Sequence, residues 1–298
     1  MSFGQRRYAG ENELLDAKFA ERGVLICAHR GSWHGNVVQN TTIAFKAALM
    51  QGADILETDA TASVDGEVFA LHDGYEERMF GWRHSALDMS ADQIAGFLPT
   101  NALGEPSSHR VQRLEEVLAY LCHEELLNID RTWRAKGLVL DILDRHPHMR
   151  RQAILKAPLE HRAVFEQLAE HPIKYMAMPI CRSLADVDEA LSYRDLNVVG
   201  VEMIAPTPQD ELFSDEAIAY VHGKGLFCWA NALTLTDVFP RAALYGGLDD
   251  DTSIWHGPEA GWGRLIDKGI DVIQTDWPAL LRDFRARWPG ARRGSKAR

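Results

Sequence analysis

The chain lacks the features of a disulfide-stapled, zinc-bound or membrane-spanning protein. Its 298 residues include only four cysteines, at positions 27, 122, 181 and 228, and no Cys-x-x-Cys pair. Such isolated cysteines predict free thiols, most of them buried. No apolar run is long enough to cross a bilayer, and the first residues lead into a polar segment instead of the apolar core of a secretion signal. We therefore expect a soluble, cytoplasmic protein.

Positive charge is also scarce, except at the C-terminal end. The 32 Lys and Arg are outnumbered by 43 Asp and Glu, which gives a net charge of −11. This balance argues against a nucleic-acid partner, because such proteins carry a basic face. From position 285 onward there are six basic side chains and no acid: Arg285, Arg287, Arg292, Arg293, Lys296 and Arg298. We interpret the basic C-terminal tail, about 289–298, as a solvated chain end and not as a binding arm.

Short apolar runs alternate with segments that have apolar residues at helical spacing. The runs predict eight strands: Val24 to Ala28, Ile55 to Asp59, Leu126 to Asp130, Ala153 to Lys156, Tyr175 to Pro179, Val198 to Ile204, Leu226 to Ala230 and Val272 to Thr275. The spacing predicts helices over Thr41 to Gln51, Leu114 to His123, Lys136 to His146, Glu160 to Glu170, Ser183 to Ser192, Ser214 to Gly223, Gly261 to Lys268 and Pro278 to Trp288.

Eight strands that alternate with helices predict a (β/α)8 TIM barrel, an α/β fold, occupying residues 1–298 as a single domain. The alternative, an open doubly wound sheet, normally has a glycine-rich dinucleotide turn after its first strand. The residues at that place, His29-Arg30-Gly31-Ser32-Trp33, do not form one. The stretch of about 74–113 has no obvious strand and is long for a loop. We therefore expect a small insertion after the second strand that packs over the barrel mouth.

Acidic side chains gather at the carboxyl ends of the predicted strands, where barrel active sites form. Glu57 and Asp59 lie two residues apart, so their side chains share one face of the second strand. Two adjacent carboxylates repel each other unless a cation or a proton lies between them. Asp130 ends the next strand. This all-oxygen set predicts a site for one divalent cation, Mg²⁺ or Ca²⁺, with Mn²⁺ also suitable.

Two histidines flank these acids. His29 follows the first strand, and His72 follows the apolar run that starts at Val68. A lone strand histidine is more often structural, but a pair beside two acids favours acid–base catalysis. Arg30 has planar donors that suit phosphate oxygens, although a surface ion pair is the plainer interpretation.

Several ordered motifs resemble the glycerophosphodiester phosphodiesterase family. They are His29-Arg30-Gly31, Asn40-Thr41 with Ala44-Phe45, Gly52 to Asp59, Asp65-Gly66, His72-Asp73, Trp229 with Asn231, and Gly269 to Asp276 followed by Pro278. The resemblance covers most of the barrel and implies a metal-dependent phosphodiesterase. In the family, three carboxylates at the positions of Glu57, Asp59 and Asp130 bind the cation. By the same resemblance His29 and His72 are base and acid, and Arg30 holds the phosphate.

Three positions depart from the family pattern. Gln39 stands where the family has a glutamate before Asn-Thr, Asp130 is shorter than the usual glutamate, and Thr132 replaces a lysine. Lys156, at the end of the fourth strand, is a candidate replacement for that cation. Arg131 is a second candidate, but its strand parity differs from that of Asp130, which predicts that it points away. These departures put the usual glycerol-type substrate in doubt more than the chemistry.

The predicted function is hydrolysis of a small soluble phosphodiester, a glycerophosphodiester or a sugar phosphodiester, to an alcohol and a phosphomonoester. We expect His29 to be the base and His72 the acid, and Trp229 to stack on the substrate. Two alternatives stay open, a glycosidase-like enzyme acting on sugars with the same barrel and a non-catalytic ligand-binding barrel. The sequence does not determine the alcohol groups, the cation or the oligomeric state.

Overall fold

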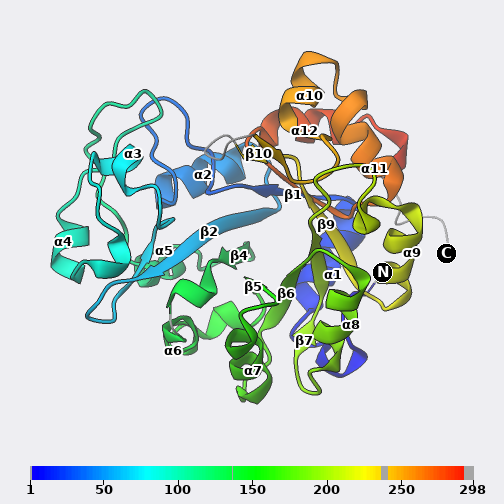
Figure 1. Ribbon diagram of the computed structural model, residues 1–298, viewed down its shortest axis with the longest axis horizontal. Helices are drawn as coiled ribbons and strands as arrows, with labels where there is room; N and C mark the ends of the chain where they lie inside the picture. Colours follow the sequence, from blue (N-terminus) through cyan, green and yellow to red (C-terminus); the bar gives the residue numbers. More distant parts are fainter. Residues whose placement is uncertain (1, 136, 236–240, 292–298) are drawn as a thin grey trace.

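The computed structural model describes residues 2–135, 137–235 and 241–291, and its centre is a closed barrel of eight parallel strands (Figure 1). The strands are β1 (Leu25–Ala28), β2 (Ile55–Ala62), β4 (Leu126–Asp130), β5 (Ala153–Pro158), β6 (Met176–Cys181), β8 (Gly200–Met203), β9 (Phe227–Asn231) and β12 (Val272–Thr275). Their order around the barrel is β1-β12-β9-β8-β6-β5-β4-β2, and pairing of β1 with β2 closes it. The predicted TIM barrel is confirmed.

Helices cover the outside of the barrel. They include α2 (Thr42–Met50), α5 (Leu114–Tyr120), α6 (Leu138–Asp144), α7 (Arg162–Glu170), α8 (Leu184–Ser192), α9 (Asp215–Gly223), α10 (Asp250–Trp255), α11 (Arg264–Lys268) and α12 (Pro278–Arg285). Each predicted strand and helix has an observed counterpart, shorter by a few residues at most helix ends. The predicted strand over Val198 to Ile204 is divided in two. β7 (Asn197–Val198) pairs with the start of β6, and β8 pairs with the end of β6.

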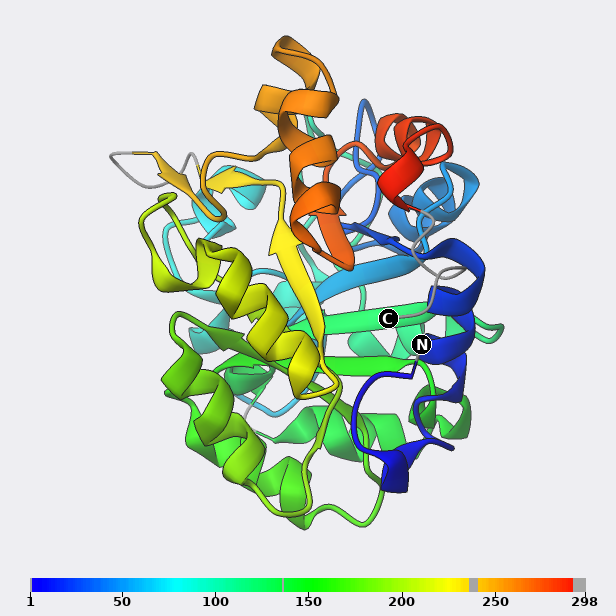
Figure 2. The same cartoon turned by 90° about the vertical axis from the view of Figure 1, so that its right-hand side faces the viewer.

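An N-terminal helix, α1 (Glu13–Arg22), closes the end of the barrel opposite the site (Figure 2). Leu15 and Phe19 from this helix are buried with Phe3 against Phe227 and other inward residues of the strands. The Phe3 and Phe19 ring centroids are 4.6 Å apart. Burying each such side chain contributes roughly 1.5–3 kcal/mol. This apolar plug, formed by Phe3, Leu15 and Phe19, therefore packs against the amino-terminal ends of the strands, while the carboxyl ends of the strands stay available for a functional site.

Carboxylates brace the same end of the barrel. The Asp54 side chain accepts a hydrogen bond from the Ile26 amide at 2.8 Å, and Asp271 accepts one from the Cys228 amide at 2.8 Å. Arg285 pairs with Asp54 and is buried. Arg285 was grouped with the basic end in the sequence, but it is the closing residue of α12. The other basic residues from position 292 onward lie outside the described residues.

The insertion after β2 is confirmed. β3 (Val68–Ala70) pairs antiparallel with β2, and α3 (Glu76–Phe80) and α4 (Ala91–Ala95) follow it. A separate apolar cluster that includes Phe69, Met79 and Ile94 holds this part together at the left of Figure 1. A short hairpin, β10 (Thr234–Leu235) with β11 (Ala242–Ala243), lies on the other side of the mouth. Among the described residues, no helix combines the length and apolar character needed to cross a membrane.

Candidate active site

Three carboxylates meet at the carboxyl ends of β2 and β4. Parallel pairing sets Asp59 opposite Asp130, and Glu57 is on the same face of β2 two residues earlier. One ligand oxygen from each of the three lies within 4.8 Å of the others. Glu57 and Asp59 are each 1% exposed. The set is all oxygen and spans two strands, so it fits a hard divalent cation such as Mg²⁺ or Ca²⁺.

The electrostatics of these acids are unequal. Burial raises the pKa of Glu57 well above its usual value, and Asp59 raises it further, while Lys156 and Arg30 oppose the shift. Burial alone would also raise the pKa of Asp59. There the Arg30 guanidinium, whose Nε is 3.1 Å from Oδ2, acts together with His72, Asn40 and His29 to outweigh burial and lower the pKa of Asp59. Glu57 is therefore the carboxylate that most needs a proton or a cation beside it.

The backbone around the acids is held in an unusual conformation. Among the described residues, only three that are not glycine have positive φ, namely Arg30 (55°), Asn40 (57°) and Arg131 (57°). All three lie at this site, and strained backbone persists where surrounding contacts enforce it. The Arg30 amide donates to Glu57 Oε2 at 2.7 Å, and the Asn40 amide group donates to Asp59 Oδ2 at 2.9 Å. These bonds orient the carboxylates, and sequence reasoning did not assign Asn40 a role.

His29 is oriented by an acid from the last strand. Its Nδ1 lies 2.9 Å from Asp276 Oδ1. The Asp276 amide in turn donates to Asp250 Oδ2 at 2.8 Å. Burial opposes ionisation of Asp276, but His29, with Arg30 and His34, outweighs burial and lowers the pKa of Asp276. From the sequence, Asp276 was assigned no separate role. The structure pairs it with His29, so Nε2 is the ring nitrogen that faces away from the acid.

His72 has a different environment. Its Nδ1 is 2.7 Å from the Asp73 carbonyl, and its Nε2 is 3.3 Å from Arg131 Nη1. Burial lowers the pKa of His72 to about 4, with Arg30 and Arg131 adding to the effect and Asp59 opposing it. The prediction that Arg131 points away is wrong. Strand parity ends at Asp130, and the left-handed φ of Arg131 turns its side chain toward His72.

Lys156 and Trp229 are buried below the site. The Lys156 ammonium is 2.8 Å from Asp130 Oδ2 and 2.9 Å from Glu202 Oε2. Burial alone would lower its pKa, but these acids raise it. Trp229 is 0% exposed, and its indole NH donates to Asn231 at 2.8 Å. The expectation that Trp229 stacks on substrate is therefore corrected, because its ring has no accessible face in this structure.

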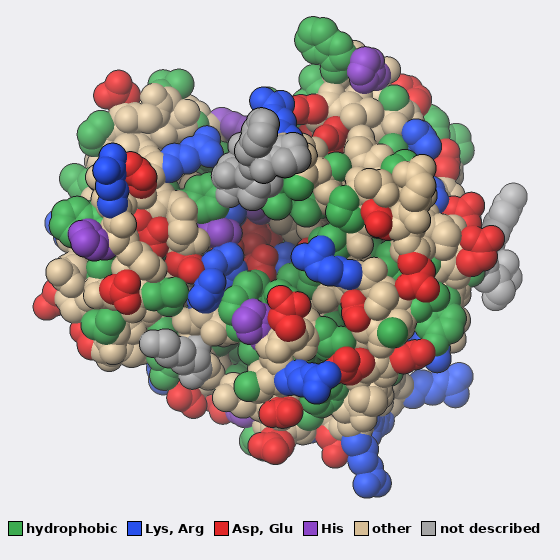
Figure 3. Space-filling view, viewed as in Figure 1, with side chains coloured by type: hydrophobic (Ala, Val, Ile, Leu, Met, Phe, Trp, Pro, Cys, Tyr) green, Lys and Arg blue, Asp and Glu red, His purple; other side chains and the backbone are tan. Residues whose placement is uncertain are grey.

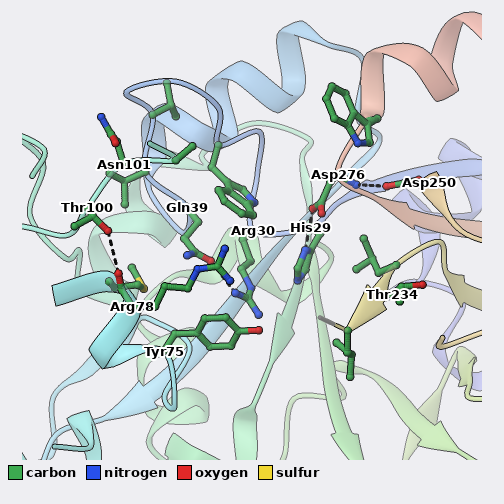
Figure 4. A pocket seen from close by; sticks show the side chains of 18 of the residues that line it. His29, Arg30, Gln39, Tyr75, Arg78, Thr100, Asn101, Thr234, Asp250 and Asp276 are labelled. Atoms are coloured by element: carbon green, nitrogen blue, oxygen red, sulfur yellow. Dashed lines mark hydrogen bonds and ion pairs between the residues drawn. The ribbon is translucent and has the colours of Figure 1, made fainter. Parts of the chain in front are cut away.

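A cavity of about 520 Å³ lies directly above His29 and Arg30. Figure 3 shows the hollow at the centre of this face, with acidic side chains at its floor. Figure 4 shows Arg78, Thr100 and Asn101 from the insertion on one side, and Thr234 and Asp276 on the other. Its aromatic lining comes from Trp33, Tyr75 and Trp277. The volume is in the range of small-molecule sites.

The insertion tip is fastened to the loop after β1. Asn101 donates to the Asn36 side chain at 2.8 Å, and the Ala102 amide donates to the Gly35 carbonyl at 3.2 Å. Arg30 Nη1 donates to Gln39 Oε1 at 2.7 Å in the same wall, and the Arg30 guanidinium lies over the Tyr75 ring. The insertion thus forms one wall of the cavity.

Comparison with known proteins gives matches to both halves of the chain. The model of the glycerophosphoryl diester phosphodiesterase family matches residues 29–153, and that of a domain of unknown function matches residues 175–285. The uncharacterized protein YqiK of Bacillus subtilis is 24% identical over 270 residues, covering 87% of this chain and 98% of the relative. A glycerophosphodiester phosphodiesterase of Bacillus altitudinis is 28% identical over 155 residues, covering 49% of this chain and 63% of that protein.

Solved structures share the fold. A glycerophosphoryl diester phosphodiesterase from Parabacteroides distasonis has a TM-score of 0.65 at 18% identity, covering 87% of this chain and 85% of that one. A phosphodiesterase from Oleispira antarctica, in complex with its product sn-glycerol-3-phosphate, has a TM-score of 0.65 at 14% identity, covering 87% and 95%. The sequence matches lie mainly in the first half of the barrel and the solved structures share the whole barrel, so the chain resembles a glycerophosphodiester phosphodiesterase-like hydrolase.

Proposed function

We propose that the protein is a metal-dependent phosphodiesterase. It hydrolyses a small phosphodiester, a glycerophosphodiester or a sugar phosphodiester, to an alcohol and a phosphomonoester. The observation that carries this proposal is the cluster of Glu57, Asp59 and Asp130 at the barrel mouth, with Arg30 and the two histidines beside it. The sn-glycerol-3-phosphate bound to the Oleispira relative is the product class that such a reaction releases.

Glu57, Asp59 and Asp130 would hold the cation, Mg²⁺ or Ca²⁺, with Mn²⁺ also suitable. When bound, the cation supplies positive charge that offsets charge developing on the phosphate oxygens. The raised pKa of Glu57 is consistent with this role, because a buried acid next to Asp59 is stabilised by a bound cation. Arg30, held over Tyr75, would bind a further phosphate oxygen.

The histidines would transfer the protons. His29, oriented by Asp276, faces the cavity and would take a proton from the water that attacks the phosphorus. His72 returns a proton to the leaving alkoxide. Its low pKa in the ligand-free protein leaves it neutral near pH 7, so it must gain a proton after the substrate binds. The phosphate anion favours that gain, because a nearby negative charge raises the pKa of an imidazole.

The cavity walls indicate the kind of alcohol that fits. Trp33 and Trp277 offer flat faces, while Thr100, Asn101 and Thr234 offer hydrogen-bonding groups. Aromatic faces beside polar side chains suit a sugar ring, a glycerol or a small cationic head group. Because Trp229 is buried, the aromatic contact would come from the loops and not from β9.

The proposal is tested by hydrolysis of a small substrate panel. The panel is glycerophosphocholine, glycerophosphoethanolamine, a sugar phosphodiester, bis-p-nitrophenyl phosphate and a phosphate-free aryl glycoside, each with Mg²⁺, Ca²⁺, Mn²⁺ or EDTA. We expect turnover that EDTA removes and that His29→Ala lowers by roughly 10²–10⁴. Metal-independent cleavage of the glycoside would instead support the sugar-acting alternative. Tight ligand binding with no turnover of any substrate would support the non-catalytic one.

A further inference from the structure

By the family resemblance, Thr132 stands where a lysine would supply a further positive charge to the phosphate. Thr132 is buried and donates its hydroxyl to the Lys156 carbonyl at 2.9 Å. Lys156, the expected substitute, is enclosed at 2% exposure between Asp130 and Glu202. An ammonium shared by two carboxylates, the buried Glu202 and the partly buried Asp130, is already neutralised. Lys156 is therefore occupied by these two acids, and another cation near the carboxylates has to supply the positive charge for the phosphate.

We propose that Arg131 binds a non-bridging oxygen of the substrate phosphate, in place of the lysine. This inference rests on the proposed phosphodiesterase function. Arg131 directly follows Asp130, and its guanidinium reaches His72, the proposed acid, with Nη1 3.3 Å from His72 Nε2. Its side chain is 16% exposed, so it is neither fully enclosed nor on the open surface.

The backbone of Arg131 supports a role beyond structure. A φ of 57° is sterically unfavourable for arginine, which has a Cβ. The other two described non-glycine residues with this conformation, Arg30 and Asn40, both contact the carboxylate cluster. The turn lets Asp130 and Arg131 both point toward the mouth, which two consecutive strand residues cannot do.

The guanidinium is anchored by Asp73 along one edge and faces His72 at the other. Arg131 Nε is 2.6 Å and Nη2 is 2.5 Å from Asp73 Oδ1. Nη1 is directed to His72 Nε2 at 3.3 Å. A guanidinium paired in this way presents its remaining N–H groups in a fixed direction, here toward the histidine. A phosphate oxygen is a stronger acceptor than a neutral imidazole nitrogen and would take over this donor.

Arg134 is a natural comparison. Its Nε is 3.3 Å from the other oxygen of Asp73, and its side chain is 42% exposed. It therefore shares the anchor of Arg131, while no contact with His72 is described for it. If these arginines only neutralise Asp73, removing either should have a similar effect. If Arg131 binds phosphate, only its removal should weaken phosphate binding.

The test compares Arg131→Asn, Arg131→Lys and Arg134→Asn with the wild type. Asparagine tolerates the left-handed backbone, so Arg131→Asn removes the charge with little added strain. Titration calorimetry of the Mg²⁺-loaded protein measures the Kd of inorganic phosphate and of sn-glycerol 3-phosphate, and steady-state kinetics measure KM and kcat. We expect Arg131→Asn to weaken phosphate binding and raise KM by about 10- to 100-fold. Arg131→Lys should retain part of the affinity, and Arg134→Asn should stay within about twofold of the wild type.

Melting temperature and Mg²⁺ affinity are measured on every variant, so that a loss of folding is separated from a loss of binding. If Arg131→Asn binds phosphate as the wild type does while the wild type hydrolyses phosphodiesters, the inference is wrong and the proposed function stands. Equal losses in Arg131→Asn and Arg134→Asn would also refute it, because they would mark a structural role. If the wild type neither binds phosphate nor cleaves any phosphodiester, both the inference and the proposed function fail.

Discussion

The pair of Asp276 and His29 gives a sharp prediction for catalysis. Asp276 Oδ1 lies 2.9 Å from His29 Nδ1, and the lowered pKa of Asp276 keeps this acid ionised at neutral pH. The carboxylate thus fixes the Nδ1–H tautomer of His29, leaves Nε2 free to accept a proton, and stabilises the imidazolium that results. Asp276→Asn keeps the shape and removes the charge. We call Asp276 a positioning residue, because it would act through His29.

The size of the effect follows from the role of His29. A positioned general base contributes about 10²–10⁴ in rate, so kcat should fall by up to that factor in Asp276→Asn, or by about 3–5 kcal/mol in transition-state stabilisation. KM should change little, because the Asp276 carboxylate is engaged with His29, and the Asp276 backbone amide, which the substitution leaves in place, donates to Asp250. The assay is steady-state hydrolysis of the preferred substrate across pH 5–9.

The control is Asp251→Asn, the same chemical change on an exposed acid of the same cavity. Its kcat should stay within about twofold of the wild type, because a surface acid at a distance affects the site weakly. If Asp276→Asn retains full kcat with an unchanged pH profile, His29 is not the base or does not depend on this acid. A large loss in Asp251→Asn would also contradict the reasoning, since it would point to the field of the whole cavity.

Three further predictions concern buried charge. Folding lowers the pKa of His72 from 6.5 to about 4, so as the pH drops from about 6.5 to 4 the unfolded chain takes up the proton first and the free energy of unfolding falls. In His72→Gln this pH-dependent fall should be smaller by up to about 3 kcal/mol, as measured by calorimetry of the metal-free protein. Glu57→Gln should weaken Mg²⁺ binding by at least about tenfold and yet raise the melting temperature of the metal-free protein, because a buried acid with a raised pKa destabilises the fold above its usual pKa; a lower melting temperature would contradict this. Lys156→Met should cost about 3–5 kcal/mol in urea unfolding, since it leaves the buried Glu202 and the partly buried Asp130 without their cation, and Lys156→Met with Glu202→Leu should recover part of that loss.

The barrel was predictable because its signals are local. Each strand is a short apolar run with both faces buried, and each helix repeats apolar residues at helical spacing. The carboxylate cluster was predictable for the same reason. Glu57 and Asp59 are separated by the period of a strand, and Asp130 ends the strand that pairs with theirs. Only the register and the convergence of the three oxygens had to come from the structure.

The two errors have different causes. Arg131 was expected to point away, but a left-handed residue directly after β4 reverses its direction. Trp229 was expected at the mouth, but it faces the barrel interior, where the plug of α1 packs beneath it. A β-strand tells which side a residue faces and not how deep it lies along the barrel axis.

The sequence by itself determined the fold class, the strand ends that carry chemistry and the kind of cation that the acids suit, because each depends on residue types and spacing along the chain. The tertiary structure decided the partners: Asp276 for His29, Asp73 for Arg131, and two carboxylates for Lys156. These pairs join residues far apart in the sequence, up to 247 positions for His29 and Asp276. Their distances depend on how the closed barrel brings the strand ends together, and no local pattern records them.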